Sequence, residues 1–428
     1  MVSLILFGVF FLLLFLNIPI GLSLGISSVA ALLYEKLPLS MIPSNLYSST
    51  GKFVLLAIPF FILGGNVMEK SGISSRLINF CRTLVGHKKS GMAMVCVIVS
   101  CFFAAISGSG PATVAALGMI IIPAMTRVGY DKASSAALMS TAGAIGIIIP
   151  PSITFVIYGS ITGKSVGALF ASGILPGLLM GFSLILAMQF VSRDRPLDLL
   201  PKASWPERWK NFKEAFWGLM MPVIILGCIY GGITTTTEAA AIATAYAIPV
   251  GFFIYKKLTY TELKNSFIDA AKATGTIMLL TLTVQMLSRM FIDVNLPKLI
   301  LNAFYSVTDN RWGIMLMINL FMIVLGMLMD DTSGCLLATP ILVPIIKELG
   351  FSPVHFAAIL AVNLGMGNIT PPVAPLLYFS SRIIDAPLKE MLKPTLIYFL
   401  FAWLPTLLLT IFVPGIATWL PQLFGYAI

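Results

Sequence analysis

The chain contains two copies of one apolar pattern, which align without a gap when residues 107–151 are placed on residues 328–372, 221 positions later. Prolines and glycines fall at corresponding places: Pro123 and Pro344, Gly129 and Gly350, Gly146 and Gly367, and Pro150–Pro151 and Pro371–Pro372. An apolar unit that is repeated and interrupted in this way is typical of secondary transporters, whose binding sites lie between the repeats. The pattern indicates transport, and chance similarity between two apolar stretches is the alternative.

The composition is that of a membrane protein. Hydrophobic residues make up 58% of the 428 residues and charged residues 10%, and the mean hydropathy is +0.96. Apolar stretches of about 20 residues, enough for a helix to cross the hydrocarbon, recur along the whole chain. We therefore expect an all-α polytopic membrane protein without a separate soluble domain.

The net charge of +10 comes from Lys and Arg in short links between apolar stretches, so it indicates orientation in the bilayer rather than nucleic-acid binding. The first apolar run, residues 3–33, has no basic start and no small-residue cleavage site, and we interpret it as membrane structure. Because this run contains Pro19, it forms either one kinked span or two short ones. The five cysteines form no CxxC pair and there are two histidines, His87 and His355, so neither a disulfide framework nor a zinc site is expected.

Counting crossings from the basic link at residues 193–213, which the positive-inside rule places in the cytoplasm, predicts the topology. Residues 91–126 form a re-entrant hairpin that enters from the cytoplasm, and residues 311–349 form a second hairpin that enters from the outer side. Residues 131–160 and 353–380 are crossings broken by glycine and proline. The two copies are thus expected to have opposite orientations. Two segments that mix charged and apolar residues, Ile73–Val85 and Tyr260–Ala271, are expected to lie in the interface as amphipathic helices before the hairpins, or to be ordinary loops.

This topology divides the chain into four parts. Residues 1–51 are N-terminal scaffold spans, and residues 52–192 are the first repeat with hairpin 91–126 and broken helix 131–160. Residues 193–272 are a cytoplasmic link with scaffold helices, and residues 273–428 are the second repeat with hairpin 311–349 and broken helix 353–380.

Four interruptions lie at predicted membrane depth: residues 107–111, 143–151, 330–334 and 365–372. A broken backbone at this depth needs protein or a water-filled cavity around it, because unsatisfied amides and carbonyls are costly in lipid. Glycine lets the chain turn, and proline removes an amide donor and frees a carbonyl upstream. These carbonyls, with Ser, Thr and Asn oxygens, suit a hard monovalent cation.

Each hairpin tip is expected to form a cation site with the broken crossing of its own repeat. The first site consists of Ser107, Gly108, Ser109, Gly143, Gly146 and Pro150. The second consists of Asp331, Thr332, Ser333, Gly334, Gly367, Asn368 and Thr370.

The residues expected to face the substrate are Ser107, Ser109, Ser152 and Asp330. Helix N-termini at the tips favour a carboxylate. Ionisable groups at membrane depth are costly and mark functional sites, which singles out Asp330 and Asp331. The alternative is that these two residues only cap the second hairpin helix.

Two other patterns each lack a required residue. The sequence GSITGKS at 159–165 resembles a phosphate loop, but the motif needs glycine where this chain has Tyr158. The sequence DTSG at 331–334 resembles an aspartic-protease loop, but the first tip offers no second carboxylate to share a proton. ATP-driven transport is therefore not supported and no enzymatic activity is expected, with an intramembrane hydrolase using Asp330 and Asp331 as an alternative.

Several segments together resemble the large membrane subunit of TRAP transporters, the tripartite ATP-independent periplasmic family. They are FFAAISGSGPATVAALGMIIIPAM, GAIGIIIPPSITFVIYG, LFASGILPGLLMG, IPFFILGGNVMEKSG and MGNITPPVAP. The resemblance covers nearly the whole chain. It implies a bacterial inner-membrane importer of organic acids, driven by co-transported sodium ions, in which hairpins and broken helices move as one body in an elevator mechanism.

The resemblance also implies two partners, a small four-helix membrane subunit and a periplasmic substrate-binding protein. Because nothing precedes residue 1, the small subunit is expected as a separate polypeptide. The implied ligand class includes C4-dicarboxylates, sialic acid and sugar acids, and the chain most resembles the sialic acid branch. The alternatives are a stand-alone sodium/dicarboxylate symporter of related architecture and, from another class, a channel.

Overall fold

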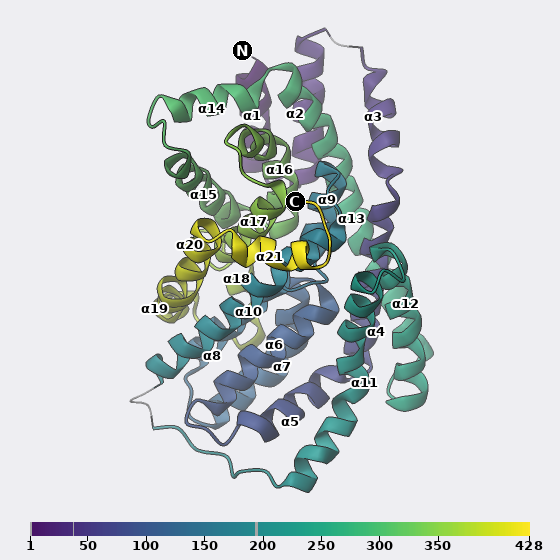
Figure 1. Ribbon diagram of the computed structural model, residues 1–428, viewed down its shortest axis with the longest axis vertical. Coiled ribbons are helices and arrows are strands. Elements are labelled where there is room, and N and C mark those ends of the chain that lie inside the picture. The colour runs from purple at the N-terminus through teal and green to yellow at the C-terminus, as the bar shows by residue number, and fades with distance from the viewer. Residues whose placement is uncertain (1, 37, 193–195) are drawn as a thin grey trace.

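The computed structural model describes residues 2–36, 38–192 and 196–428, and over these ranges the regular secondary structure is helical (Figure 1). Eight helical segments of the described chain are long and apolar enough to cross a membrane by length and composition. The predicted all-α polytopic class is therefore confirmed. The first three residues of the predicted basic link, 193–195, lie outside the described residues.

The first repeat consists of a hairpin and a broken helix, flanked by other helices. Its elements are α4 (Ala57–Lys70), α5 (Ile73–Val85), α6 (Gly91–Ser107), α7 (Gly110–Arg127), α8 (Lys132–Gly143), α9 (Ile153–Thr162) and α10 (Val166–Val191). Helices α6 and α7 form the predicted hairpin, with only two residues between them. A 3-10 turn, Ala144–Ile147 (η2), and a non-helical stretch separate α8 from α9, so the predicted break is present.

The second repeat has the same order of elements. They are α13 (Tyr260–Asp293), α14 (Leu296–Tyr305), α15 (Arg311–Leu328), α16 (Asp331–Glu348), α17 (Pro353–Gly367), α18 (Pro375–Ile384), α19 (Leu388–Tyr398) and α20 (Leu404–Phe412), with a π-helical turn, Phe399–Trp403 (η4), before α20. Helices α15 and α16 form the second hairpin, and α17 and α18 form the second broken helix. Figure 1 shows α5–α7 in the lower part of the molecule and α14–α16 in the upper part, so the hairpins enter from opposite ends.

The prediction of an interfacial helix at Tyr260–Ala271 is wrong. This segment is the first part of α13, which continues without interruption for 34 residues, so the predicted domain boundary at residue 272 falls inside a helix. The amphipathic helix before the second hairpin is α14, which occupies the position of α5 in the first repeat. Helix α5 is separated from α4 by Gly72, whose φ of +75° ends the first helix and redirects the chain. The corresponding break in the second repeat lies between α13 and α14, where Asn295 has a φ of +50°.

The remaining helices lie beside the repeats. They are α1 (Val2–Phe15), α2 (Ile20–Tyr34), α3 (Met41–Thr50), α11 (Trp205–Tyr230), α12 (Thr236–Pro249) and α21 (Gly415–Leu423), with short turns at Phe53–Leu56 (η1) and Val250–Ile254 (η3). The N-terminal run forms two short helices rather than one kinked span. Pro19 precedes α2 at its cap, where its missing N–H group costs no helical hydrogen bond.

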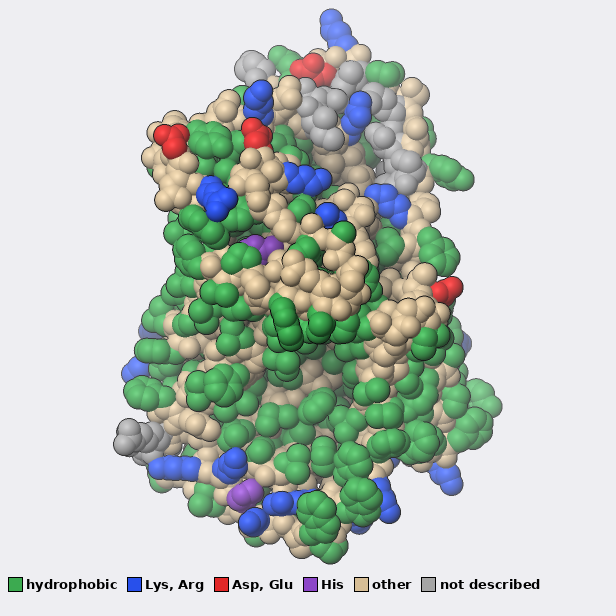
Figure 2. Space-filling view, in the orientation of Figure 1, with side chains coloured by type: hydrophobic (Ala, Val, Ile, Leu, Met, Phe, Trp, Pro, Cys, Tyr) green, Lys and Arg blue, Asp and Glu red, His purple; other side chains and the backbone are tan. Residues whose placement is uncertain are grey.

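Charged side chains lie mainly towards the two ends of the long axis, and apolar side chains cover most of the face between them (Figure 2). On this face, Lys and Arg are seen towards both ends, including the lower end near α5 and the start of α11, whereas most of the visible Asp and Glu lie near the upper end. An apolar belt between polar ends is the surface that a bilayer requires.

Candidate functional site

The tip of the first hairpin depends on one glycine. Gly108 follows α6 with φ +62°, and its N–H donates to the Ala104 carbonyl at 2.9 Å. A Cβ atom at this position would lie 2.5 Å from the carbonyl oxygen of Pro151. Glycine is therefore required twice, by the left-handed backbone and by the close approach of the broken helix. Ser109 then caps α7 by accepting the Ala112 N–H at 3.5 Å.

This tip rests on the break of its own repeat, as the sequence predicted. The N–H of Ile153, the first residue of α9, donates to the Gly108 carbonyl at 3.2 Å. On the other side, a Cβ atom on Gly146 would lie 2.8 Å from the Ser109 carbonyl oxygen, so only glycine fits between the 3-10 turn and the tip. Gly143 contacts the same hairpin helix at Val114, and Pro150 is buried in the stretch between η2 and α9.

Three oxygens gather at this contact. Ser107 Oγ lies 3.2 Å from Thr113 Oγ1 and 3.4 Å from the Ser109 carbonyl oxygen. Thr113 Oγ1 donates to that same carbonyl at 2.8 Å. Thr113 is fully buried and was not predicted from the sequence. Thr113 lies one turn into α7, which places it beside the tip. This position could not be predicted without knowing that α7 begins at Gly110.

The tip of the second hairpin is capped by an acid. The Asp330 carboxylate accepts the N–H groups of Thr332 at 3.2 Å and Ser333 at 3.4 Å, so the capping alternative is confirmed for this residue. Asp330 is only half-buried and also lines a cavity. Capping a helix and facing a ligand are therefore compatible for Asp330.

The neighbouring acid, Asp331, has a different environment. It is buried, and its Oδ2 accepts the hydroxyl hydrogen of Thr154 in α9 at 3.0 Å. The Asn368 side chain, from the break between α17 and α18, lies close to the same carboxyl group. Asn368 is 1% exposed, and its Oδ1 has no hydrogen-bond partner among the described residues. An unpartnered buried carbonyl oxygen beside a carboxyl group is a suitable ligand for a cation.

The other residues of the predicted second site lie around this tip. The Thr332 side chain lines the cavity, and Ser333 is buried behind it. A Cβ atom on Gly334 would meet Leu364 Cδ2 at 2.8 Å, and one on Gly367 would meet Gly326 Cα at 2.6 Å, so these glycines let the broken helix approach the hairpin. Thr370 Oγ1 donates to the Met366 carbonyl at 2.7 Å.

A cavity of about 320 Å³, here called the hairpin cavity, lies where the two tips meet α4 and α13. Its lining from the tips includes Ser107, Gly108, Ser109, Asp330, Asp331 and Thr332. The structure thus brings together three of the four residues predicted to face the substrate. The fourth, Ser152, is fully buried away from the lining, and its hydroxyl donates to the Ile147 carbonyl at 2.7 Å.

The wall opposite the tips was missed in the sequence. It consists of Asn66 and Glu69 on α4 and Asp269 on α13. Asp269 forms an ion pair with Lys70 at 3.1 Å, which links the two helices at the rim of the cavity. The signal for Glu69 was a charged pair at the end of an otherwise apolar stretch. Asp269 was obscured because its segment was interpreted as interfacial.

The fold and this site define a class of proteins, the membrane transporters built from inverted repeats with paired hairpins. The structure is similar to that of the YdaH transporter of Alcanivorax borkumensis, with a TM-score of 0.62 at 15% identity over 87% of each chain. It is also similar to MtrF of Neisseria gonorrhoeae, described as one of a class of antimetabolite efflux pumps, with a TM-score of 0.61 at 14% identity over 88% of this chain and 84% of that chain. At these identities the similarity shows a shared fold.

The family itself is shown by sequence. Residues 7–416 match the tripartite ATP-independent periplasmic transporter, DctM component. The chain is 35% identical to the C4-dicarboxylate TRAP transporter large permease protein DctM of Vibrio cholerae, covering 95% of this chain and 94% of that protein. It is 34% identical to the sialic acid TRAP transporter large permease protein SiaM of the same organism, covering 97% of both. The chain therefore belongs to the DctM family of TRAP transporter large permease proteins.

One relative is longer than this chain. The chain is 38% identical to the isethionate TRAP transporter permease protein DctMQ of Oleidesulfovibrio alaskensis over 96% of its own length. It spans 65% of that protein.

Proposed function

We propose that this chain is the large transmembrane subunit of a sodium-driven importer of organic acids in the inner membrane of a bacterium. The observation that carries the proposal is the hairpin cavity, where Ser109 of the first tip and Asp330 of the second meet α4 and α13. A site between two inverted repeats, lined by helix N-termini at interruptions of the chain, is the arrangement that secondary transporters use for anionic substrates. The N-termini of α7 and α16 supply partial positive charge for a carboxylate.

Sodium binding is proposed at the two oxygen-rich contacts behind the tips. The first contains Ser107 Oγ, Thr113 Oγ1 and the Ser109 carbonyl oxygen. The second contains the Asp331 carboxylate and the unpartnered Asn368 Oδ1. Cations in these places order the tips, so substrate and sodium binding support each other through the same backbone.

The proposed movement is of the elevator type. The hairpins and broken helices hold one another through backbone contacts such as Ile153 N–H to Gly108 O, at 3.2 Å, and Val373 N–H to Met327 O, also at 3.2 Å. Helices α4 and α13 form the other wall of the hairpin cavity and are joined to each other by the Lys70–Asp269 ion pair. The cavity therefore lies on the boundary between a moving body and a fixed one.

The proposed ligand class follows from the relatives, whose names specify C4-dicarboxylates, sialic acid and isethionate. All three are small organic anions. The proposed partners are a small membrane subunit and a periplasmic substrate-binding protein, as the tripartite family name implies.

The test is uptake into proteoliposomes that contain the chain with its small subunit, supplied with the cognate binding protein and an inward sodium gradient. Radiolabelled succinate, N-acetylneuraminate and isethionate are compared. Asp330→Asn retains helix capping, because Asn caps as well as Asp does, but removes the charge at the cavity. We expect it to reduce uptake at least about tenfold, because the variant loses about 1.4 kcal/mol of attraction between the Asp330 carboxylate and the sodium ion proposed beside Asp331.

The matched control is Asp131→Asn. Asp131 caps α8 by accepting the Ser134 N–H at 2.7 Å and does not line the hairpin cavity. Uptake by this variant should equal that of the unchanged protein. Equal uptake by both variants would remove the second tip from the mechanism, and uptake without a binding protein would indicate a stand-alone symporter.

A further inference from the structure

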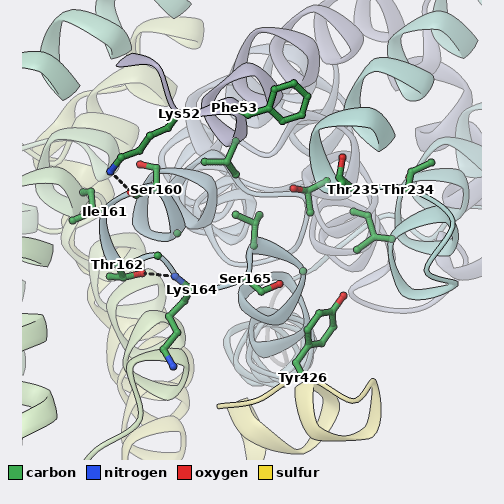
Figure 3. A pocket seen from close by; sticks show the side chains of 17 residues that line it. Lys52, Phe53, Ser160, Ile161, Thr162, Lys164, Ser165, Thr234, Thr235 and Tyr426 are labelled. Carbon is green, nitrogen blue, oxygen red and sulfur yellow. Dashed lines mark hydrogen bonds between the residues drawn. The ribbon is translucent and has the colours of Figure 1, made fainter. Parts of the chain in front are cut away.

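The GSITGKS loop, which the transport site does not use, forms one wall of a larger cavity. This cavity has a volume of about 840 Å³ and is here called the loop cavity (Figure 3). The stretch from residue 159, near the end of α9, to residue 167, at the start of α10, faces residues 52–54 before α4 and residues 234–236 at the start of α12. Ile229 and Tyr426 complete the lining. The loop cavity thus lies between the repeat body and the helices that pack beside it.

The lining is cationic. It contains Lys52 and Lys164, and none of its described residues is Asp or Glu. Lys52 Nζ donates to the Ser160 carbonyl at 2.6 Å, which satisfies one donor but supplies no counter-charge. Burial lowers the pKa of Lys52 from its ordinary value, as expected for an ammonium group removed from water without a carboxylate. Glu238, the acid nearest in sequence to residues 234–236, uses its carboxylate to cap α12 through Thr235, at 2.8 and 2.9 Å.

Neutral donors also face this space. Figure 3 shows the Tyr426 hydroxyl and the Ser165 side chain directed towards the middle of the group. A Cβ atom on Gly167 would lie 2.5 Å from the Tyr426 hydroxyl oxygen, so glycine at this position lets Tyr426 pack against the first turn of α10. Two ammonium groups with several unused donors, and no acid in the lining, are a site for an oxyanion.

Two elements contribute to the lining of both the loop cavity and the hairpin cavity. Ile153, the first residue of α9, lines the hairpin cavity, whereas Ser160 and Thr162 at the other end of α9 line the loop cavity. Along the second element, Phe53 of η1 lines the loop cavity and Ile62 of α4 lines the hairpin cavity. At about 1.5 Å per helical residue, Ile153 and Thr162 at the two ends of α9 lie roughly 13 Å apart.

We propose that the loop cavity binds a soluble organic carboxylate and is a preliminary site from which the ligand reaches the hairpin cavity. This inference rests on the proposed import of organic acids. A carboxylate held between Lys52 and Lys164 replaces the missing counter-charge. Because the two lysines belong to opposite walls, the bound anion also bridges the repeat body and the helices beside it.

The experiment measures thiol modification and requires neither sodium gradient nor partners. Thr236→Cys is introduced into the full chain with its five native cysteines replaced by serine or alanine, and the purified protein is treated with an anionic or a cationic methanethiosulfonate reagent. We expect the anionic reagent to be favoured about tenfold relative to the same ratio at the exposed control Ser306→Cys, because a cationic cavity concentrates anions. Replacing both lysines, Lys52→Gln with Lys164→Gln, should abolish this preference.

Succinate or N-acetylneuraminate should slow modification of Thr236→Cys, and neutral erythritol should not. Ser165→Cys provides a second position, since Ser165 also lines the cavity and is exposed. The inference is overturned if neither position prefers the anionic reagent, if the preference survives loss of both lysines, or if only added phosphatidylglycerol, and neither carboxylate, slows the reaction. Uptake that depends on Asp330 in such a case leaves the proposed function intact. Protection by a carboxylate without any uptake would support the site in the loop cavity and contradict the proposed function.

Discussion

Thr154 donates its hydroxyl hydrogen to Asp331 Oδ2 at 3.0 Å, and this bond joins the broken helix of the first repeat to the hairpin tip of the second. The two residues are separated by 177 positions in the chain. Asp331 is also within reach of Asn368 from the second broken helix. One carboxyl group therefore lies at a contact between both repeats.

Thr154→Val should destabilise this connection. Valine has nearly the shape of threonine but no hydroxyl, so Asp331 loses a partner in a buried place, at a cost of about 1–3 kcal/mol. We expect a lower thermal unfolding temperature of the purified protein and reduced sodium-dependent uptake. Thr154→Ser keeps the hydroxyl and should retain most of both properties. An unfolding temperature of the valine variant equal to that of the unchanged protein would show that the bond does not join the repeats.

Thr113→Val tests the first proposed sodium site. The substitution removes one of three oxygens near the tip without changing the volume of the buried side chain. We expect the sodium concentration for half-maximal uptake to rise about tenfold, the effect of losing about 1.4 kcal/mol of binding. Thr141→Val is the control, because Thr141 is equally buried but bonds only to the carbonyls of its own helix. An unchanged sodium dependence of the Thr113 variant would place the ion elsewhere.

Gly108→Ala should disrupt the first tip. The substitution puts a Cβ atom against the Pro151 carbonyl and also strains a backbone with φ +62°. Gly350→Ala separates the two effects, because Gly350 has φ +76° but nothing within 4 Å of the added atom. We expect Gly350→Ala to cost about 1–2 kcal/mol of stability and to leave uptake measurable. Gly108→Ala should abolish uptake, and similar behaviour of the two variants would show that the contact with Pro151 is unimportant.

Cysteines placed at Lys88 and Lys347 should report opposite sides of the membrane. Both positions are exposed. Lys88 immediately precedes the first hairpin, and Lys347 lies at the end of the second. In intact cells, a membrane-impermeant thiol reagent should label Lys347→Cys and not Lys88→Cys, with the reverse result in inverted vesicles. Labelling of both positions from one side contradicts the inverted topology.

The sequence predicted the repeat, the hairpins and the breaks because these depend on residues that act locally. Glycine and proline determine where a helix can stop, so Gly108 and the break after Gly143 could be placed from composition and spacing alone. The pairing of the first tip with its own break also followed from the repeat. Asp330 was correctly recognised as a possible cap from its position before α16.

Other parts of the site depend on contacts between distant segments, which a single sequence does not reveal. Thr154 was one hydroxyl among many in an apolar helix, and its partner Asp331 lies in the other repeat. Asp269 was misplaced because alternating polar and apolar residues suit an interfacial helix as well as the exposed end of a long one. Ser152 was expected to face the substrate, but the local turn directs its hydroxyl to Ile147.

The length of α13 has a consequence for the surrounding lipid. Its 34 residues are about 51 Å long, well beyond a hydrocarbon layer of about 30 Å. The part from Ala273 to Phe291 is about 28 Å long and matches that layer, so we expect the part from Tyr260 to Lys272 to continue the same helix beyond it. Asp269 then stands just outside the hydrocarbon while Ile277 stands inside it, and both line the hairpin cavity. The thickness of the bilayer thereby determines how deep in the membrane this cavity lies, and lipids with longer or shorter chains should alter transport without touching the ligand.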